Sequence, residues 1–403
     1  MTNTNKIEYA QDTDGIGFDI DLYVDGKPII WKNINEFTIK ESVYAFIPRL
    51  EMSFLDDGFF TEHNPILEGQ VVEVTISTNK ETSPYVKQKF MVLSTNALPT
   101  SHTNDRFIIN IIGILNAPGL INGIKSKSFP ANKFSEVAKS IASQNGLSFD
   151  ARLESSDKMN WYQLNQTDND FMNNSIYRSY VADDDVPFCF INRSGTVVYT
   201  SLKTESKSPS EFILVKDNLK GNDKIVPGGI ERFYTSHSYS DKSGLINTLC
   251  GGYGTKLSHY DGNKIVTEDI TTMAFSELTT YRNKLKDNYD KFTNSTMKFG
   301  TLNNVYTNYF KSIVNNDLVR KSLFSTSLII NAQANNYQLF DKINIEVKLG
   351  NDLIKSQSGN YIIGSIIHNL NKKGKYNQLL VCFRDGVGTN NTTVVFNNPL
   401  KDG

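Results

Sequence analysis

Two short stretches of strict apolar–polar alternation constrain this chain more than any other feature. VVEVTIS begins at Val71 and INIEVKLG begins at Ile343. Their alternating apolar positions are Val72, Val74 and Ile76, followed 271 positions later by Ile343, Ile345 and Val347. Side chains that alternate with a period of two point to opposite faces of a β-strand. Each stretch therefore predicts a strand with one buried face.

The same offset aligns two further apolar runs without a gap. It places Phe90–Val92 on Tyr361–Ile363, and it places Ile108, Ile109 and Ile112 on Leu379, Leu380 and Phe383. A one-residue slip would turn the apolar face of a strand to water, so two equivalent sheets require a common phase. Two unrelated β-regions with loops of similar length would align in the same way. The pattern thus favours an internal repeat over a chance match without deciding between them.

Residues from about 15 to 115 predict a small antiparallel barrel or sandwich. FDIDLYVDGKPII reads as two strands around Asp25–Gly26, since Asp-Gly is a strong hairpin signal. RLEMSFLDDGFF alternates Leu50, Met52 and Phe54 before its own turn residues. The strands at Val72–Ile76, near residue 90 and near residue 110 complete this region. In the strand near residue 110, Ile108 and Ile112 are expected to lie on the same face.

The pattern changes at Pro118–Gly119, where helical periodicity begins. NKFSEVAKSIASQNG predicts a helix capped by Asn132 and ended by Gly146, with one apolar stripe. Its stripe consists of Phe134, Val137, Ala138, Ile141 and Ala142. TDNDFMNNSIYRSY predicts a second helix capped by Thr167 or Asp168, and FCFINRSGTVVYTSL predicts a hairpin. Together these elements predict a compact α+β module.

The predicted organisation is a β-rich α+β fold with two similar antiparallel β-barrels. Short strands and two weakly amphipathic helices, at 275–292 and 303–324, follow the α+β module. The predicted segments are a first barrel at 1–115, an α+β inserted module at 116–205, a β/helical connecting module at 206–322, a second barrel at 323–388 and a polar tail at 389–403. One chain with two equivalent barrels can build a closed ring with more barrels than subunits, and three chains would give six barrel positions.

Composition gives no electrostatic argument for a nucleic-acid or membrane partner. The 403 residues carry a net charge of −1, and charged residues make up 21% of the chain. Cys189, Cys250 and Cys382 are widely spaced, which indicates reduced thiols in a protein made in the cytoplasm rather than a disulfide framework or a zinc site. Neither a signal peptide nor a membrane anchor is expected from the sequence.

No motif in the sequence selects a catalytic or metal site. Gly251–Lys256 lacks the spacing of a phosphate-binding loop, and Asp183–Asp185 is expected to be a solvated turn rather than a cation site. The five histidines are His63, His102, His237, His259 and His368; they are isolated in sequence, and surface positions are expected for His237 and His259. The basic loop 371–378 is expected to be solvated. We therefore expect no catalytic residue, metal or cofactor.

The stretch KMNWYQLNQTDNDFMNNSIYRSY, with DDDVPFCFINRSGTVVY after it, resembles hub proteins of contractile injection machines. These are the baseplate hubs of tailed phages and the N-terminal part of VgrG-type spikes. Trp161, Gln166, Asp168 and Phe171 occupy the family's pattern of an aromatic strand, a Gln and a helix that begins with Asp-x-x-Phe. The resemblance follows the order of elements over about 15–390 but is residue-specific only over about 130–202. The chain departs from VgrG proteins in lacking a valine-glycine repeat β-helix.

From the residues alone, Trp161 and Phe171 are expected to be core anchors and Asp168 a helix cap worth about 1 kcal/mol. The resemblance implies tube-type barrels and a homotrimeric, pseudo-sixfold ring in the virion tail or baseplate, assembled in the host cytoplasm. It implies as partners a central spike protein, a tail tube or tube-initiator protein, a tape measure protein and surrounding baseplate proteins. DNA would pass through the channel without specific binding.

Two other classes of function remain open on sequence grounds. A tail-associated cell-wall hydrolase would need two carboxylates at a suitable separation in a cleft, and no pair is singled out by the sequence. A carbohydrate- or receptor-binding β-protein would use exposed aromatic side chains such as Tyr253 and Tyr260.

Overall fold

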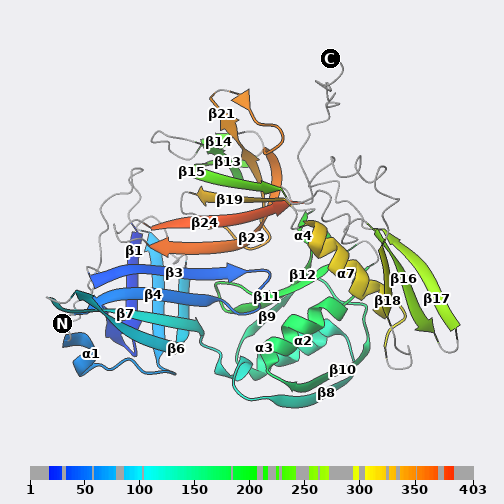
Figure 1. Cartoon of the computed structure of the whole chain (residues 1–403), viewed down its shortest axis with the longest axis horizontal. Coiled ribbons are helices and arrows are strands. Elements are labelled where there is room, and N and C mark those ends of the chain that lie inside the picture. Colours follow the sequence, from blue (N-terminus) through cyan, green and yellow to red (C-terminus); the bar gives the residue numbers. More distant parts are fainter. Residues whose placement is uncertain are drawn as a thin grey trace.

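The structure, a computed structural model, is dominated by one large β-sheet that curls into two barrels (Figure 1). It describes residues 18–29, 33–56, 59–78, 86–101, 104–182, 185–206, 212–216, 224–226, 229–241, 254–261, 264–271, 294–298, 305–323, 326–332, 336–350, 352–370 and 376–384. In the view of Figure 1 an α+β module lies at the lower right, and a smaller sheet with a long helix lies at the right.

The first barrel is built from residues 18–115 in the strand order β2-β1-β5-β6-β7-β4-β3. Its elements are β1 (Phe18–Val24), β2 (Lys27–Pro28), β3 (Ile34–Ser42), β4 (Arg49–Asp56), α1 (Phe59–His63), β5 (Val71–Thr78), β6 (Val86–Ser101) and β7 (Asn104–Leu115). Asp25 and Gly26 both have positive φ, as the predicted two-residue hairpin turn requires. Every ladder is antiparallel, and among the described residues β1 and β3 are not paired with each other.

The second barrel is closed by six strands in the order β23-β20-β13-β15-β19-β24, because β24 pairs back onto β23. They are β13 (Phe212–Lys216), β15 (Gly229–Asp241), β19 (Thr326–Ala332), β20 (Lys342–Glu346), β23 (Gly359–Leu370) and β24 (Tyr376–Arg384). Two small additions are β14 (Lys224–Val226) on β15 and the hairpin β21 (Lys348–Leu349) with β22 (Asp352–Leu353). The predicted fold class, β-rich with two barrel domains, is confirmed.

Two details of the second barrel differ from the prediction. Strands β13 and β15 lie in the segment 206–322 that was predicted to connect the domains, whereas the predicted barrel began at 323. The segment after 323 supplies only four long strands, which are too few to close a barrel by themselves. In addition, β13 runs parallel to both of its neighbours, so this barrel is not purely antiparallel.

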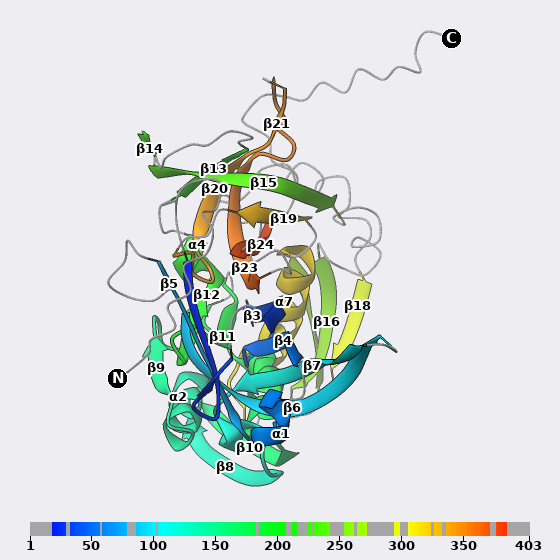
Figure 2. The same cartoon turned by 90° about the vertical axis from the view of Figure 1, so that its left-hand side faces the viewer.

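The α+β module packs against one end of the first barrel (Figures 1 and 2). Its elements are η2 (Pro118–Leu120), β8 (Lys125–Asn132), α2 (Phe134–Gln144), β9 (Ser148–Ala151), β10 (Met159–Gln166), α3 (Asp168–Ser175), η3 (Ile176–Arg178), β11 (Pro187–Ile191), β12 (Thr196–Ser201) and α4 (Leu202–Ser206). The stripe predicted for α2 is buried in the module's core, and Gly146 has the expected positive φ. The helix is capped by Lys133 rather than by Asn132, which is the last residue of β8.

The remaining elements form a small side sheet and helix α7 (Tyr309–Leu323). The sheet contains β16 (Gly254–Asp261), β17 (Lys264–Thr271) and β18 (Asn294–Lys298). Helix α7 docks on the α+β module partly through polar side chains: Asn316 Nδ2 donates to the Tyr177 and Ser179 carbonyls at 2.9 and 3.1 Å. This explains its weak amphipathicity in the sequence. The predicted helix at 275–292 lies outside the described residues.

Candidate functional site

The two barrels carry the same strand ladder at the positions where the sequence repeats. In the first barrel Val72 of β5 lies opposite Phe90 of β6, and in the second Ile343 of β20 lies opposite Tyr361 of β23. Each residue of the pair in the first barrel is therefore 271 positions before its counterpart in the second barrel. The six alternating residues Val72, Val74, Ile76, Ile343, Ile345 and Val347 are all buried, the first three in the core of the first barrel and the last three in that of the second.

A β-bulge marks the same position in both barrels. The ladder between β6 and β7 shifts between Val92 and Ser94, and the ladder between β23 and β24 shifts between Ile363 and Ser365. The bulged residues are thus Leu93 and Gly364, again 271 positions apart. A bulge inserts one residue into one strand and is not required by alternation alone. Its recurrence at an equivalent place is strong structural evidence for a true internal repeat.

A second bulge extends the equivalence to β3 and β15. The ladder of β3 with β4 shifts between Ile34 and Glu36, and that of β15 with β19 shifts between Tyr234 and Ser236. In each barrel this strand is the last of four consecutive neighbours, which are β6-β7-β4-β3 in the first barrel and β23-β24-β19-β15 in the second. Residues of β3 and β15 therefore correspond at a spacing of 200 positions.

The alignment of the third strand requires a correction of two residues. Pairing places Ile114 of β7 opposite Met91, and Phe383 of β24 opposite Ile362, so Phe383 corresponds to Ile114 rather than to Ile112. The connection between the paired strands differs in length, which the ungapped comparison could not register. Because the error is an even number of residues, it does not exchange the faces of the strand.

The buried face of β7 also differs from the expectation. Ile109 and Ile111 point into the core, whereas Ile112 is exposed and Ile108 is half-buried. Both faces of β7 carry isoleucine, so the alternation there does not identify the inner face. The outer face is identified by the hydrogen bond from Asn110 Nδ2 to Asn96 Oδ1, at 2.8 Å, between β7 and β6.

The barrels are joined within the chain by an antiparallel ladder between β3 and β23. It runs from Ser42 opposite Ser365 to Phe37 opposite Leu370. Leu370 and Tyr376, from the far end of the β23–β24 hairpin, are buried in the core of the first barrel. The second barrel thus completes the hydrophobic core of the first, and a continuous sheet passes from one to the other (Figure 1).

A buried polar cluster lies along this junction. His368 Nε2 is 2.8 Å from Glu41 Oε1, and His368 Nδ1 is 2.6 Å from the Tyr376 hydroxyl. Arg193 Nε, from the β11–β12 turn of the α+β module, lies 3.6 Å from the same Glu41 oxygen. The cluster therefore connects both barrels and the module. His368, which is isolated in the sequence, is therefore part of a buried cluster in the folded chain.

Electrostatics in the cluster favour an ionised glutamate beside a neutral histidine. Burial acts to raise the pKa of Glu41, but the Arg193 charge and the His368 hydrogen bond outweigh it and leave that pKa lowered. Burial lowers the pKa of His368, against the opposing effect of Glu41. Neutral His368 would then donate a hydrogen bond from Nε2 to Glu41 and accept a hydrogen bond from the Tyr376 hydroxyl at Nδ1.

The outer face of the continuous sheet carries short polar side chains on several strands, beside the charged Lys40 and Glu51 and the exposed apolar Ile112 and Ile329. Its strands contribute Thr38 from β3, Ser53 from β4, Asn110 from β7, Asn369 from β23, Asn377 from β24 and Asn331 from β19. Asn369 Nδ2 donates to Asn377 Oδ1 at 3.2 Å, and Asn377 Nδ2 donates to Asn331 Oδ1 at 2.6 Å. Short amide and hydroxyl side chains thus line this face where the two barrels meet.

The residues of the family pattern lie together in the α+β module, away from this face. Trp161 and Phe171 are buried; the indole Nε1 donates to the Asn132 carbonyl at 2.9 Å, and Phe171 stacks on Phe129. Gln166 is half-buried at the end of β10, where its carbonyl accepts a 3.0 Å hydrogen bond from Gln163. These contacts are those of a structural core.

The buried Asp168 carboxylate accepts several hydrogen bonds and is not the cap of helix α3. Thr167 is the N-cap of α3, and its hydroxyl accepts the Asp170 N–H at 3.1 Å. The Asp168 carboxylate accepts from Lys125 Nζ at 2.5 Å, Gln163 Nε2 at 2.9 Å and Asn145 Nδ2 at 3.0 Å. Burial acts to raise the pKa of Asp168, but these donors outweigh it and hold the pKa below its usual value.

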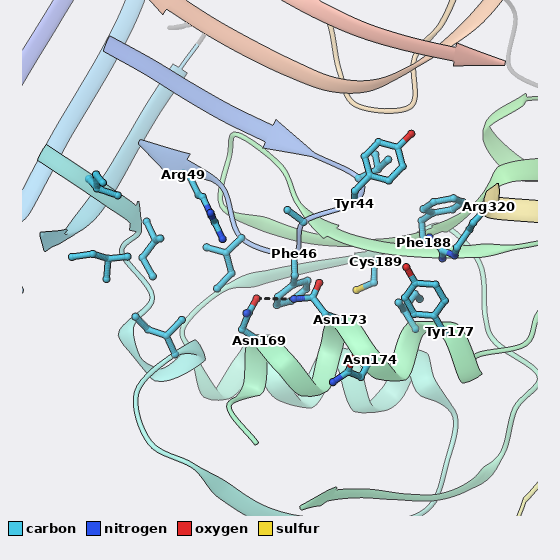
Figure 3. A pocket seen from close by; sticks show the side chains of 18 residues that line it. Tyr44, Phe46, Arg49, Asn169, Asn173, Asn174, Tyr177, Phe188, Cys189 and Arg320 are labelled. Carbon is cyan, nitrogen blue, oxygen red and sulfur yellow. Dashed lines mark hydrogen bonds between the residues drawn. The ribbon is translucent and has the colours of Figure 1, made fainter. Parts of the chain in front are cut away.

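A cavity of about 670 Å³ opens between the first barrel and the α+β module (Figure 3). Arg320 of α7 lies at one side of it, with its guanidinium 4.1 Å from the Phe188 ring and 4.8 Å from the Tyr177 ring. Burial lowers the pKa of Arg320 to about 10. Asn173 and Asn169, joined by a 3.1 Å hydrogen bond, form another wall. Within the part of the chain that the structure describes, neither a carboxylate nor a histidine lines the cavity, so it lacks the groups that acid–base hydrolysis needs.

The other candidate positions add no chemical site. Within the described ranges, no group of three or more His, Cys, Asp or Glu side chains could hold a metal ion. Burial raises the pKa of both the Cys189 and the Cys382 thiol, which disfavours reactive thiolates. His237 and His259 are both half-buried. Among the same residues, no helix is long and apolar enough to cross a membrane.

Several predicted positions lie outside the described residues. These are Gly251–Tyr253, Asp183, Asp184, His102, Cys250, the loop 371–375 and the tail 389–403, together with the side chain of Tyr260. Asp185 is buried, and its carboxylate accepts the Lys203 N–H at 2.9 Å.

Comparison with solved structures identifies this architecture in tail proteins. A tail protein from Neisseria meningitidis MC58 shares 10% identity with a TM-score of 0.57, covering 92% of this chain and 98% of its own. The 43 kDa tail protein of prophage MuSo2 from Shewanella oneidensis shares 11% identity with a TM-score of 0.56, covering 91% and 98%.

A third similar structure comes from a secretion system. The E. coli c3393 protein, a type VI secretion component described as structurally similar to the T4 tail proteins gp27 and gp5, shares 9% identity with a TM-score of 0.51 over 92% of this chain and 79% of its own. No protein-family model and no curated protein matches the sequence. The chain therefore has the fold of these phage tail proteins and of the type VI secretion component, as the resemblance of its Trp161–Phe171 segment predicts.

Proposed function

We propose that this chain is a structural hub of a phage tail or baseplate. Three copies would form a ring of six barrels that joins a sixfold tail tube to a threefold central spike. The observation that carries the proposal is the pair of equivalent barrels in one chain, with matching registers and matching bulges, joined edge to edge by β3 and β23. A ring of near-identical barrels needs this kind of repeating edge-to-edge contact.

The outer face of the joined sheets suits the wall of a channel. Its serine, threonine and asparagine side chains offer small, neutral contacts, Lys40 and Glu51 on the same face have opposite charges, and the chain as a whole is nearly neutral. Such a surface would let a tape measure protein and DNA pass without strong electrostatic capture. A tail tube or tube-initiator protein, the spike and surrounding baseplate proteins would bind the other surfaces of the ring.

The role is structural, with no reaction assigned to the chain. The cavity beside α7 has no carboxylate pair among the residues the structure describes, and the buried Glu41–His368–Tyr376 cluster is enclosed in the barrel junction. A buried cluster without access to substrate acts on packing and stability rather than on catalysis.

The mass of the purified chain in solution tests the proposal. We expect a stable trimer, and electron micrographs should show annular particles with a central opening. A monomer at all accessible concentrations would contradict the hub. Solubilisation of peptidoglycan by the same preparation would favour the hydrolase instead, and specific glycan binding that is lost in Tyr253→Ala with the trimer intact would favour the carbohydrate-binding alternative.

A further inference from the structure

Among the described residues, each barrel has a long strand with a neighbouring strand on only one side over part of its length. In the first barrel β5 pairs with β6 only as far as Met91, so from Ser94 onward β6 has β7 on one side and no described strand on the other. In the second barrel β13 pairs with β15 only as far as Tyr234, so in the described part of the chain the rest of β15 forms a ladder with β19 on one side only. Unpaired edges invite pairing with another chain.

These two edges correspond to the two edges that already pair inside the chain. The free part of β6, Ser94–Pro99, corresponds at an offset of 271 to Ser365–Leu370 of β23. The part of β15 beyond its ladder with β13, from His237 onward, corresponds at an offset of 200 to the segment of β3 that begins at Phe37. The internal ladder between β3 and β23 is therefore a template for a ladder between β15 and β6.

We propose that β15 of one copy pairs antiparallel with β6 of the next copy, in the register of the internal junction. This inference rests on the hub assembly proposed above and specifies its subunit contact. The predicted opposite pairs are Ser240 with Asn96, Tyr239 with Ala97, Ser238 with Leu98 and His237 with Pro99. They follow from the internal pairs of β3 and β23 by the two offsets.

The predicted register keeps the faces of the two sheets in agreement. On β15, Tyr239 and His237 lie opposite the buried Leu328 and Ile330 of β19, which places them on the barrel's inner face. On β6, Ala97 lies opposite Ile109, whose side chain is also buried inside its barrel. In the proposed ladder, residues on the inner face of one barrel therefore lie opposite residues on the inner face of the neighbouring barrel. A slip of one position would break this agreement across the whole contact.

An exposed aromatic residue marks the same contact. Phe107 lies opposite Pro99 at the end of the β6–β7 hairpin, as Tyr376 lies opposite Leu370 at the end of the β23–β24 hairpin. Tyr376 is 6% exposed because the first barrel's core encloses it, whereas Phe107 is 40% exposed. In the proposed contact Phe107 enters the second barrel of the neighbouring copy, in the way that Tyr376 enters the first barrel of its own chain.

The contact closes into a ring without using any edge twice. Each first barrel pairs through β3 with its own second barrel and through β6 with that of one neighbour. Each second barrel pairs through β23 with its own first barrel and through β15 with that of the other neighbour. The contact is heterologous, and a heterologous contact forms a ring when its rotation closes.

Disulfide crosslinking of the full chain tests the register. Asn96→Cys with Ser240→Cys places two thiols opposite each other on the outer face, at a separation that a disulfide can bridge. We expect mild oxidation to give covalent dimers and trimers that reduction reverses. The matched control, Asn96→Cys with Ser238→Cys, moves one thiol two positions along the strand and should crosslink at least about tenfold less, because diagonal neighbours lie farther apart.

A second pair of variants tests the aromatic contact. Phe107→Ser should leave the monomer folded, since this side chain is exposed in one copy, and should weaken trimer formation at least about tenfold, in keeping with loss of a buried aromatic anchor. Tyr162→Ser, at an aromatic side chain that is 50% exposed on β10 of the α+β module and outside the proposed contact, is the control and should change trimer formation little. Circular dichroism confirms that both variants are folded.

The outcomes separate this inference from the function on which it rests. A wild-type monomer would contradict the hub and the contact together. A wild-type trimer whose Asn96–Ser240 thiols do not crosslink, or crosslink no better than the Asn96–Ser238 control, would overturn the contact and leave the hub standing. Equal effects of Phe107→Ser and Tyr162→Ser on trimer formation would also overturn it.

Discussion

At the residue scale, equivalent positions in the two barrels carry side chains suited to different surroundings. The bulge residue of the first barrel is Leu93, which is exposed and lines the cavity beside the α+β module. Its equivalent, Gly364, packs so closely on the Phe383 ring that an added Cβ would collide with it. The backbone irregularity is shared, but only one of the two sites has room for a side chain.

Gly364→Ala should therefore destabilise the protein, by about 1–3 kcal/mol, as overpacking in a filled core does. Leu93→Ala is the matched control and should change the free energy of unfolding by less than about 1 kcal/mol, because its side chain is exposed. Urea unfolding of both variants measures the difference. Equal losses would mean that the Phe383 ring moves aside.

Substitutions at Asp168 and Thr167 distinguish the contribution of a buried ion pair to stability from that of a helix cap. Asp168→Ala removes a carboxylate that accepts from Lys125, Gln163 and Asn145, and leaves those donors without it. Breaking a buried pair in this way is expected to cost about 3–5 kcal/mol. Thr167→Ala removes only the cap and should cost about 1 kcal/mol. Thermal unfolding would contradict this assignment if Thr167→Ala were the more damaging change.

The Glu41–His368 cluster makes stability depend on pH. The pKa of His368 is lowered in the folded protein, so below the ordinary histidine pKa the unfolded chain binds more protons and folding stability falls as the pH falls. Glu41, whose pKa is also lowered, adds a further loss at lower pH, below the usual glutamate range.

His368→Gln should accordingly flatten the dependence of unfolding free energy on pH between about 7 and 5. One group contributes at most about 1.4 kcal/mol per pH unit, which sets the size of the change. Denaturant titrations at several pH values measure it, with His63→Gln, at an exposed side chain on α1, as the comparison. An unchanged slope would show that His368 keeps its ordinary pKa in the folded chain.

At the scale of elements, paired strands with a buried inner face form both barrels. Val74 of β5 and Ile345 of β20 are buried at equivalent places in the two cores. A charge at either position would have to be buried without a partner or would force its strand out of register.

Val74→Asp and Ile345→Asp should each prevent folding or assembly of the ring. The control Asn344→Asp changes a neighbouring half-buried residue on the opposite face of β20 and should be tolerated. Soluble yield and solution mass report the outcome. Normal trimers from both apolar-to-Asp variants would contradict the shared inner phase of the barrels.

At the scale of the whole molecule, the β3–β23 ladder makes the two barrels mutually dependent. Leu370 and Tyr376 of the second barrel's hairpin lie in the first barrel's core, and Arg193 of the α+β module reaches the junction. Elements that share buried contacts unfold together.

Calorimetry of the full chain should therefore show the two barrels melting in one transition. The isolated first barrel, residues 1–115, should not fold stably, because it lacks the two side chains that complete its core. Separate transitions for the two barrels, or a stable isolated first barrel, would mean that the junction contributes little to stability.

The strand alternation, the offset that relates β5–β6 to β20–β23 and the helices of the α+β module could be predicted from the amino-acid sequence, because they follow from local periodicity. Three features emerge only in the folded chain: β13 and β15 belong to the second barrel, Asp168 binds Lys125 rather than capping a helix, and His368 meets Glu41. Each of these joins residues far apart in the chain, and pairing at such a distance is fixed by the packing of whole strands, which periodicity along the sequence does not encode.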